Sequence, residues 1–335
     1  EHMREPSLLG AQIKGSSLRM LANFQELEQF TIYAGNQLQQ IEIRSLPKLQ
    51  RLSIDSDTIH DCRVVIDDLP ACTELHLSIW AQGEARVTEA TITNVPNITR
   101  LSVPNPREIY VSDLPKLEYL LLRTGRCESI YLENMPAVRR LYMENTTIGD
   151  HVLEQVSKLT ALQRIQMDDA RVQDASLRHL RNLTELQRIE LWRAPIDGSG
   201  FVYFSELTKL RHLRLGQTQV NDAALAHLSG LTELEILNLY RTPIAGPGLA
   251  HLEELHKLKE LHVPANEIDG AQLVHLQNLT NLELLMVGGN DIVDEDLVHL
   301  RELQKLKQLS LDGTNVTDAC IPHLTGLSSL KTLQA

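Results

Sequence analysis

One position in the second half of the sequence carries a histidine at intervals of 24 residues, with Tyr203 in place of one of them. Imidazole nitrogens are common zinc ligands, so such a series first suggests a metal site. Residues at one phase of a stacked repeat, however, form a line with a spacing of about 5 Å, whereas zinc needs ligands that converge as a tetrahedron. We therefore interpret this series as structural and predict no metal. Its members are His179, His227, His251, His275, His299 and His323.

The other reactive side chains lack the spacing that catalysis requires. Asp168 and Asp169 are neighbours in a predicted strand, so their carboxylates point to opposite faces and do not form a catalytic pair. His251 and His256 are five residues apart and do not share a helix face. The sequence contains no phosphate-binding loop and no nucleophile elbow. We therefore predict that the chain is not an enzyme and uses no cofactor.

The cysteines match neither a zinc pattern nor a small disulfide framework. Cys72 stands where neighbouring repeats carry a core leucine, so we expect a buried apolar residue there. A bridge between Cys62 and Cys72 stays open, because their spacing neither requires nor forbids it. The four cysteines are Cys62, Cys72, Cys127 and Cys320.

The composition is that of a folded protein, with 42 % hydrophobic and 23 % charged residues. The 32 basic and 44 acidic residues give a net charge of −12, which argues against nucleic acid as a partner. No apolar run is long enough to insert into a membrane. Residues 1–3 are expected to be a cloning remnant, and no signal peptide follows them, so the compartment stays open.

An internal repeat in the sequence predicts the strands and helices that carry these residues. The hexad Leu-x-x-Ile-x-Met at 162–167 recurs with a period of 24 residues, and its alternation of apolar and polar residues predicts a half-buried strand. The copies begin at Val138, Leu162, Leu186, Leu210, Leu234, Leu258, Leu282 and Leu306, with a further start at Leu330.

The second half of each of these later repeats predicts a short helix. Leucines lie three residues apart, as at Leu225 and Leu228, which indicates two turns with one buried side. Pro247 stands where a first helical turn tolerates proline best. An aspartate before the leucines is predicted to be the N-cap, because its carboxylate can accept the unpaired N–H groups of the first turn. These aspartates are Asp150, Asp174, Asp222, Asp294 and Asp318.

The earlier repeats are less regular, and their second halves predict a strand. The pattern Ile41-x-Ile43-x-x-Leu46-Pro47 alternates β-branched residues and ends in a proline, which cannot continue a hydrogen-bond ladder. Similar patterns end at Pro70, Pro115 and Pro136. We therefore expect three segments: an N-terminal cap or partial repeat over 1–26, irregular strand–strand repeats over 27–137, and 24-residue strand–helix repeats over 138–335.

These motifs resemble the leucine-rich-repeat superfamily over about nine tenths of the chain. The later copies, such as 231–252, are similar to 24-residue bacterial repeats related to those of ribonuclease-inhibitor-like and F-box-associated proteins. The resemblance implies an α/β fold, a right-handed solenoid with a concave parallel β-sheet. Its convex side is expected to be strand-like in the first part and helical in the second. The resemblance implies binding and no chemistry.

The concave sheet is the informative surface. The third and fifth residues of each hexad, and the residue that follows the hexad, are expected to face outward and touch no core. Arginine, tyrosine and tryptophan, which dominate interface hot spots, gather there. The alternative is a ladder of arginines and carboxylates that only solvates the sheet. The predicted partner-binding residues are Tyr119, Arg123, Arg140, Tyr142, Arg164, Arg188, Trp192, Arg214 and Tyr240.

The function predicted from these observations is non-catalytic protein–protein recognition through the concave face. The alternative is that the chain is the substrate-recognition segment of a larger effector or ligase-type enzyme whose catalytic part lies elsewhere. The sequence does not identify the partner or the oligomeric state.

Overall fold

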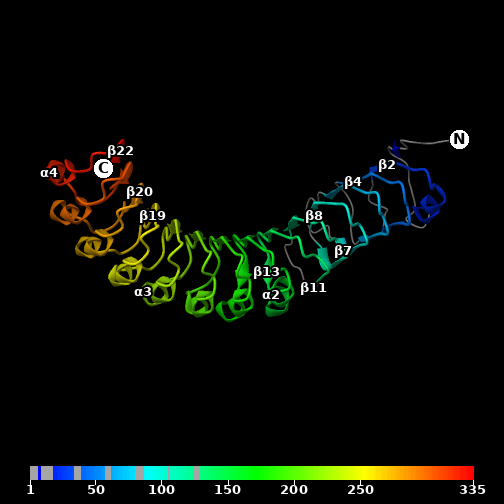
Figure 1. The fold of residues 1–335 in the computed structure, drawn as a ribbon, viewed down its shortest axis with the longest axis horizontal. Helices are drawn as coiled ribbons and strands as arrows, with labels where there is room; N and C mark the ends of the chain where they lie inside the picture. The colour runs from blue at the N-terminus through cyan, green and yellow to red at the C-terminus, as the bar shows by residue number, and fades with distance from the viewer. Residues whose placement is uncertain are drawn as a thin grey trace. The chain divides into compact units, whose positions relative to one another are not determined.

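The chain forms two compact units, Glu1–Gln163 and Arg164–Ala335. The computed structural model describes residues 7–8, 18–33, 39–56, 62–79, 87–104, 106–123 and 129–335 (Figure 1). Within each unit the chain winds through stacked repeats, and each repeat begins with a strand that pairs in parallel with its neighbours. The predicted α/β leucine-rich-repeat architecture is confirmed.

The first unit carries a ladder of strands that begin its repeats. The strands β1, β2, β4 and β6 form one parallel sheet, and β8, β10 and β12 pair in parallel as well. Their bounds are Ser7–Leu8 for β1, Gln29–Tyr33 for β2, Arg51–Ser56 for β4, Glu74–Ile79 for β6, Arg100–Pro104 for β8, Tyr119–Arg123 for β10 and Arg140–Tyr142 for β12.

A second parallel sheet in this unit is built from the second halves of the same repeats, as their alternating β-branched residues predict. Its strands are β3 (Gln40–Arg44), β5 (Cys62–Asp67), β7 (Val87–Thr93), β9 (Pro106–Ser112) and β11 (Ser129–Glu133). The remaining elements of the unit are η1 (Arg19–Asn23), β13 (Thr147–Ile148) and α2 (Asp150–Val156).

The second unit repeats one strand and one short helix. Figure 1 shows its strands on the inner side of its curve and its helices on the outer side. The strands are β14 (Arg164–Gln166), β16 (Arg188–Glu190), β17 (His212–Arg214), β18 (Ile236–Asn238), β19 (Glu260–His262), β20 (Leu284–Met286), β21 (Gln308–Ser310) and β22 (Thr332–Gln334), with β15 (Arg171–Val172) apart from this ladder.

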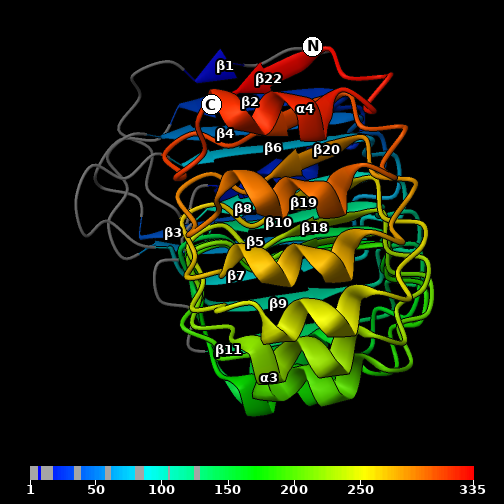
Figure 2. The ribbon, with the colours of Figure 1, turned by 90° about the vertical axis from the view of Figure 1, so that its left-hand side faces the viewer.

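The helices of the second unit stack one above another (Figure 2). Most are 3₁₀-helices, because leucines three residues apart share a side when each turn holds three residues. They are η2 (Asp174–Leu180), η3 (Ser199–Phe204), α3 (Asp222–Leu225), η4 (Ala226–Leu228), η5 (Pro247–Leu252), η6 (Gly270–Leu276), η7 (Asp294–Leu300), η8 (Asp318–Cys320) and α4 (Ile321–Leu324).

The second element of a repeat is a strand up to β11 and a helix from α2 onward, so the type of element changes between Glu133 and Asp150. This change lies inside the first unit, so it differs from the division between the units at Gln163. Pro247 is the first residue of η5, as predicted.

The prediction that the recurrent aspartates are N-caps is wrong. Asp222 and Asp318 are the first helical residues, and the caps are Asn221 and Thr317, whose side chains accept from main-chain N–H groups of the first turn. Asp150, Asp174 and Asp294 also begin their helices rather than precede them. In this position a carboxylate is free to reach the next repeat, and two of the aspartates do so with three bonds each.

The carboxylate of Asp222 accepts hydrogen bonds from the main-chain N–H groups of Ala245, Gly246 and Gly248 at 3.0, 3.3 and 2.7 Å. Asp174 accepts the equivalent three from residues 197, 198 and 200. A Cβ atom at Gly248 would lie 2.6 Å from the Asp222 carboxylate, so glycine is needed where the carboxylate approaches. The aspartate of one repeat therefore holds the first turn of the next.

Leucine, isoleucine and valine from the strands and helices fill the core, and most are fully buried. Buried threonine and asparagine side chains satisfy the main chain at the turn after several strands of the second unit. The Thr242 hydroxyl donates to the Leu239 carbonyl at 2.8 Å, and the Asn266 side chain accepts from the Thr242 N–H at 2.9 Å. Asn290 donates to Val263 and Val287 at 2.8 and 2.7 Å, so these side chains also connect repeats.

Cys62, Cys72 and Cys320 are buried free thiols, so Cys62 and Cys72 form no bridge, and Cys127 lies outside the described residues. Burial raises the pKa of Cys62 to about 12 and that of Cys72 to about 11. Cys72 thus takes the place of a core leucine, as expected. Among the helices that the structure describes, none is long and apolar enough to cross a bilayer.

Candidate partner-binding surface

We use the name strand face for the solvent-facing residues of the strands that begin each repeat, together with the turn that follows each strand. Tyr119, Arg140 and Tyr142 lie on the strand face of the first unit, on β10 and β12. Arg123 ends β10, but its side chain lies outside the described residues. The strand face of the second unit holds the other five predicted residues: Arg164, Arg188, Trp192, Arg214 and Tyr240.

In the first unit two of the predicted tyrosines come together. The rings of Tyr119 and Tyr142 are 4.9 Å apart between centroids and inclined by 33°. The guanidinium of Arg100, one strand earlier, lies 4.7 Å from the centroid of the Tyr119 ring, within the range of a cation–π contact. The strand registers explain the grouping, since Arg100, Tyr119 and Arg140 are direct partners across β8, β10 and β12.

In the second unit the rings of Trp192 and Tyr240 stack in parallel, 5.6 Å apart and 7° from coplanar. The two residues hold the same repeat position 48 residues apart, and Gly216 holds that position between them. A Cβ atom at Gly216 would lie 2.2 Å from the Trp192 ring, so only glycine leaves room for the ring. The guanidinium of Arg214 lies 5.6 Å from the Trp192 centroid, and that of Arg241 lies 5.1 Å from the Tyr240 centroid.

A buried carboxylate, Glu190, joins the predicted arginines. Its side chain is 2 % exposed and accepts hydrogen bonds from Arg164 at 2.8 Å, from Arg188, and from Arg214 at 3.3 Å. The registers place Gln166, Glu190 and Arg214 side by side on β14, β16 and β17. A carboxylate that is taken out of water needs such compensation, and three charge-assisted bonds provide it.

Neighbouring titratable groups respond to this partly dry environment. Burial raises the pKa of Asp168, whose carboxylate accepts from the Trp192 N–H at 2.9 Å and from Gln166 at 2.7 Å. Burial, and then the charge of Arg188, lowers the pKa of His212. Burial also lowers the pKa of His262, although Glu260 beside it acts in the opposite direction. Burial therefore disfavours the charged forms of Asp168, His212 and His262 at this part of the strand face, where the three arginines also lie.

The structure thus brings Trp192, Tyr240 and Arg214 together, and Arg214 joins them to Arg164 and Arg188 through Glu190. Sequence reasoning did not identify Glu190 or Gly216 as members of the site. Both appear in the same outward columns as the arginines and aromatic residues, so the column pattern was their only signal. Trp192 covers Gly216, which is itself an outward position of the next repeat.

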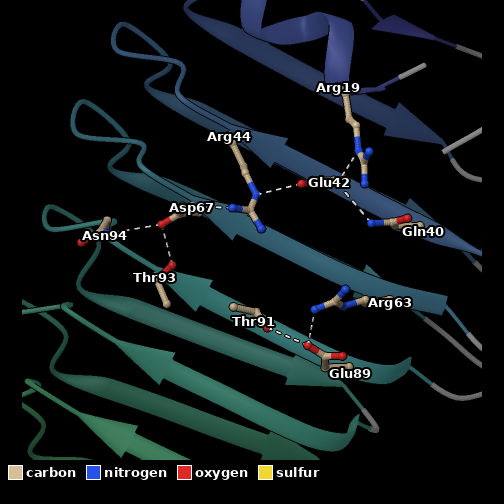
Figure 3. A network of polar contacts seen from close by, with 10 residues as sticks. All are labelled: Arg19, Gln40, Glu42, Arg44, Arg63, Asp67, Glu89, Thr91, Thr93 and Asn94. Atoms are coloured by element: carbon tan, nitrogen blue, oxygen red, sulfur yellow. Dashed lines mark hydrogen bonds and ion pairs between the residues drawn. The ribbon is translucent and has the colours of Figure 1, made fainter. Parts of the chain in front are cut away.

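The other sheet of the first unit shows a contrasting polar surface (Figure 3). On β3, β5 and β7, cations and anions alternate and satisfy one another. Glu42 pairs with Arg19 at 2.6 Å and Arg44 at 3.0 Å, and Arg63 pairs with Glu89 at 2.8 Å. The arginines of these pairs are 47–62 % exposed, and ion pairs at the surface contribute little stability, so these pairs mainly solvate the sheet. This surface fits the solvation alternative better than the strand face of the second unit does.

Successive repeats of the first unit also form an open groove of about 390 Å³ along the turns that end the strands of that sheet. Asp68, Asn94, Asp113 and Asn134 have positive φ of 52–58° at this turn, a conformation that Asn and Asp adopt more readily than most residues. The groove is lined by Asp68, Pro70, Asn94, Pro96, Asp113, Pro115 and Asn134.

The histidine series lies along the helices of the second unit. His275 contacts Glu253 of the preceding repeat at 2.5 Å, and His227 and His251 are exposed. Within the described part of the chain, no group of three or more His, Cys, Asp or Glu side chains is arranged to hold a metal ion. The structural role of the series stays a prediction.

The sequence matches no protein-family model and no curated protein. Its fold is similar to that of an internalin, InlF, from Listeria monocytogenes, with 21 % identity and a TM-score of 0.59 over 94 % of this chain and 82 % of that chain. It is also similar to a leucine-rich-repeat protein from Leptospira interrogans, with 16 % identity and a TM-score of 0.56 over 93 % of this chain and 91 % of that one. Both are bacterial proteins. This chain therefore has the leucine-rich-repeat fold.

Proposed function

We propose that this chain is a non-catalytic recognition scaffold that binds a protein partner on the strand face of its second unit. One observation carries the proposal: the parallel stack of Trp192 and Tyr240, half-buried and flanked by the guanidiniums of Arg214 and Arg241. Tryptophan, tyrosine and arginine supply most of the binding energy where proteins meet.

The proposal is supported by the glycine that the stack requires at position 216, which does not favour stability by itself. Trp192 reaches Tyr240 only because Gly216 has no side chain, and glycine in a strand-forming repeat weakens the local backbone. The result is a rigid apolar plate at the surface, held in place before a partner arrives. A preorganised surface of this kind binds with a smaller entropy loss than a flexible one.

The first unit offers a smaller group of the same kind, with Tyr119, Tyr142 and Arg100 in contact. We propose that it provides a secondary contact area. The predicted residues Tyr119, Arg123, Arg140 and Tyr142 are therefore proposed as a contact area of the first unit by itself.

The proposal is tested by capture on the immobilised chain, followed by calorimetry with the purified protein that it retains. A Trp192→Ala, Tyr240→Ala double variant should bind that protein at least thirtyfold more weakly, about 2 kcal/mol, the usual threshold for a hot spot. Tyr203→Ala, which removes an aromatic ring from η3 on the helical side, is the matched control and should bind normally.

Both variants are melted first, because loss of the stack itself removes about 0.5–1.5 kcal/mol of stability. A folded double variant that binds its partner at full strength would exclude this surface. Retention of no protein by the wild-type chain would count against the recognition function as a whole.

A further inference from the structure

Several guanidiniums share the one buried carboxylate of Glu190. Three guanidiniums, those of Arg164, Arg188 and Arg214, bond to one carboxylate. A second carboxylate, Asp168, lies close by but is bonded to an amide and a main-chain N–H rather than to a guanidinium. Arg188 and Arg214, the two more exposed guanidiniums, therefore share the single negative charge of Glu190.

The guanidiniums of Arg188 and Arg214 are on the solvent side of this carboxylate. The side chains of Arg188 and Arg214 are 32 % and 39 % exposed, whereas that of Glu190 is 2 % exposed. A molecule that approaches the strand face therefore meets guanidinium groups first, and the anion that holds them lies beneath. A guanidinium has five N–H donors in a fork that matches both oxygens of a carboxylate.

This arrangement differs from the other ion pairs of the second unit. There several lysines each pair with a glutamate of the preceding repeat, as in Lys209 with Glu185 and Lys257 with Glu233, both at 2.6 Å. Those two pairs have one cation per carboxylate and lie at the surface. Glu235 holds two cations, Arg211 and Lys259, but its side chain is 21 % exposed and not buried as that of Glu190 is. The arginine cluster is a local positive site on a chain whose net charge is −12, so an anionic partner is attracted to this place and repelled by much of the remaining surface.

The cluster is continuous with the aromatic stack, because Arg214 contacts both. It donates to Glu190 and lies over the Trp192 ring. The surface therefore offers forked cationic donors on one side and a flat apolar plate on the other. The chemistry that complements both is a carboxylate next to an apolar or aromatic side chain.

We propose that the partner presents an acidic segment to this surface, with an aspartate or glutamate on Arg188 and Arg214 and an adjacent apolar side chain on the Trp192–Tyr240 stack. This inference rests on the proposed function and names the partner's chemistry. The favourable term is a charge-assisted, forked hydrogen bond in a partly desolvated place, which is stronger than an exposed ion pair.

A displayed library of random 12-residue peptides, selected on the full chain and counter-selected on the Trp192→Ala, Tyr240→Ala variant, tests the inference. Peptides that depend on the stack should be enriched in Asp and Glu beside apolar residues. An Arg188→Gln, Arg214→Gln variant should bind them about tenfold more weakly or worse, because truncating a desolvated charge pair is costly. A Lys209→Gln, Lys257→Gln variant removes the same charge outside the cluster and should bind within about twofold, as expected for rim charges.

A third variant serves as the control for correct folding. Loss of two arginines leaves the buried Glu190 with Arg164 alone, so the pair of substitutions is also made together with Glu190→Gln, which removes the uncompensated charge. Both variants are melted before binding is measured. Weakening in the folded triple variant supports the inference, and full-strength binding by it overturns the inference.

The two proposals fail in different ways. Stack-dependent peptides that are basic or uncharged would overturn the acidic-segment inference and leave the recognition surface intact. If no peptide depends on the stack, and capture gives no protein that does, the surface itself is wrong.

Discussion

At the scale of single residues, Gly216 determines the shape of the proposed surface although it contributes no side chain. The positions at its phase in the two adjacent repeats carry Trp192 and Tyr240, and the Trp192 ring fills the space that a Cβ atom of residue 216 would occupy. The ring therefore lies across one whole repeat and meets Tyr240 in the next. A side chain at position 216 should therefore separate the Trp192 and Tyr240 rings without substituting either residue.

We predict that Gly216→Ala displaces the Trp192 ring, because the new Cβ atom would lie 2.2 Å from it. The near-ultraviolet circular dichroism of the stacked rings should decrease, and partner binding should weaken by about tenfold, as for loss of a strong interface residue. Gly230→Ala is the control, since a Cβ atom there meets nothing within 4 Å. An unchanged spectrum in Gly216→Ala would show that the ring does not need the gap.

A second residue-scale prediction concerns His262, whose side chain is 20 % exposed and whose pKa is lowered by burial. Its ordinary pKa is about 6.5, so below that pH the unfolded chain binds a proton that the folded chain resists. The free energy of unfolding therefore falls as the pH decreases from about 6.5 to the lower pKa of the folded state, by at most about 1.4 kcal/mol per pH unit.

His262→Gln should remove this part of the pH dependence. Urea unfolding at pH 7.5 and 5.5 measures it, and the variant should lose less stability on acidification than the wild type does. His227→Gln, at an exposed position on the helical side, should behave as the wild type. An equal loss in all three proteins would show that His262 does not resist protonation in the folded state.

The residues of the proposed site show how far sequence reasoning reaches. The alternation of the hexads placed Arg188, Arg214 and Trp192 on the outward face, because the side-chain period of a strand is fixed. Glu190 bonds to three neighbouring arginines. Side-chain conformations decide whether each arginine reaches it, and a repeat pattern does not contain them. Contacts across two repeats, as between Trp192 and Tyr240, depend on rotamers that a repeat pattern does not contain.

At the scale of elements, each short helix depends on the repeat before it. A helix of six or seven residues is too short to be stable alone, so its first N–H groups need partners from elsewhere. Asp222 accepts from Gly248 in η5 and from Ala245 and Gly246 immediately before it. The sequence correctly marked aspartate at this position, but the capping rule considers one helix at a time and so assigned the carboxylate to the wrong helix.

We predict that Asp222→Ala lowers the free energy of unfolding by about 1–3 kcal/mol, the cost of leaving partly buried N–H donors without acceptors. Asp222→Asn keeps one side-chain oxygen and should lose less. Asp318 is the matched control, because within the described residues its carboxylate accepts no hydrogen bond, so Asp318→Ala should change stability little. Chemical denaturation of the three variants measures the difference, and equal losses for Asp222 and Asp318 would rule out the inter-repeat role.

At the scale of the whole molecule, stability is a sum of terms between neighbouring repeats rather than the property of one central core. The repeat pattern predicted this architecture and the fully buried hexad residues, because each leucine recurs at the same phase. The pattern did not predict the division at Gln163, since the hexads continue across it without interruption. The two units are defined by how densely residues contact one another, and the spacing of the hexads in the sequence does not report that density.

The division leads to a prediction about cooperativity, since long repeat arrays often do not unfold in one step. Leu261 on β19 is fully buried in the second unit, and Leu52 on β4 is fully buried in the first. Replacing either by alanine should cost about 2–5 kcal/mol in its own unit.

Hydrogen exchange of backbone amides shows where that cost is felt, because protection reports the free energy of local opening. Leu261→Ala should lower protection across β17 to β21 and leave β3 to β9 nearly unchanged, and Leu52→Ala should do the reverse. The expectation follows from contacts that are concentrated within each compact unit. If either substitution lowers protection equally in both units, the chain unfolds as one cooperative body and the division at Gln163 has no energetic meaning.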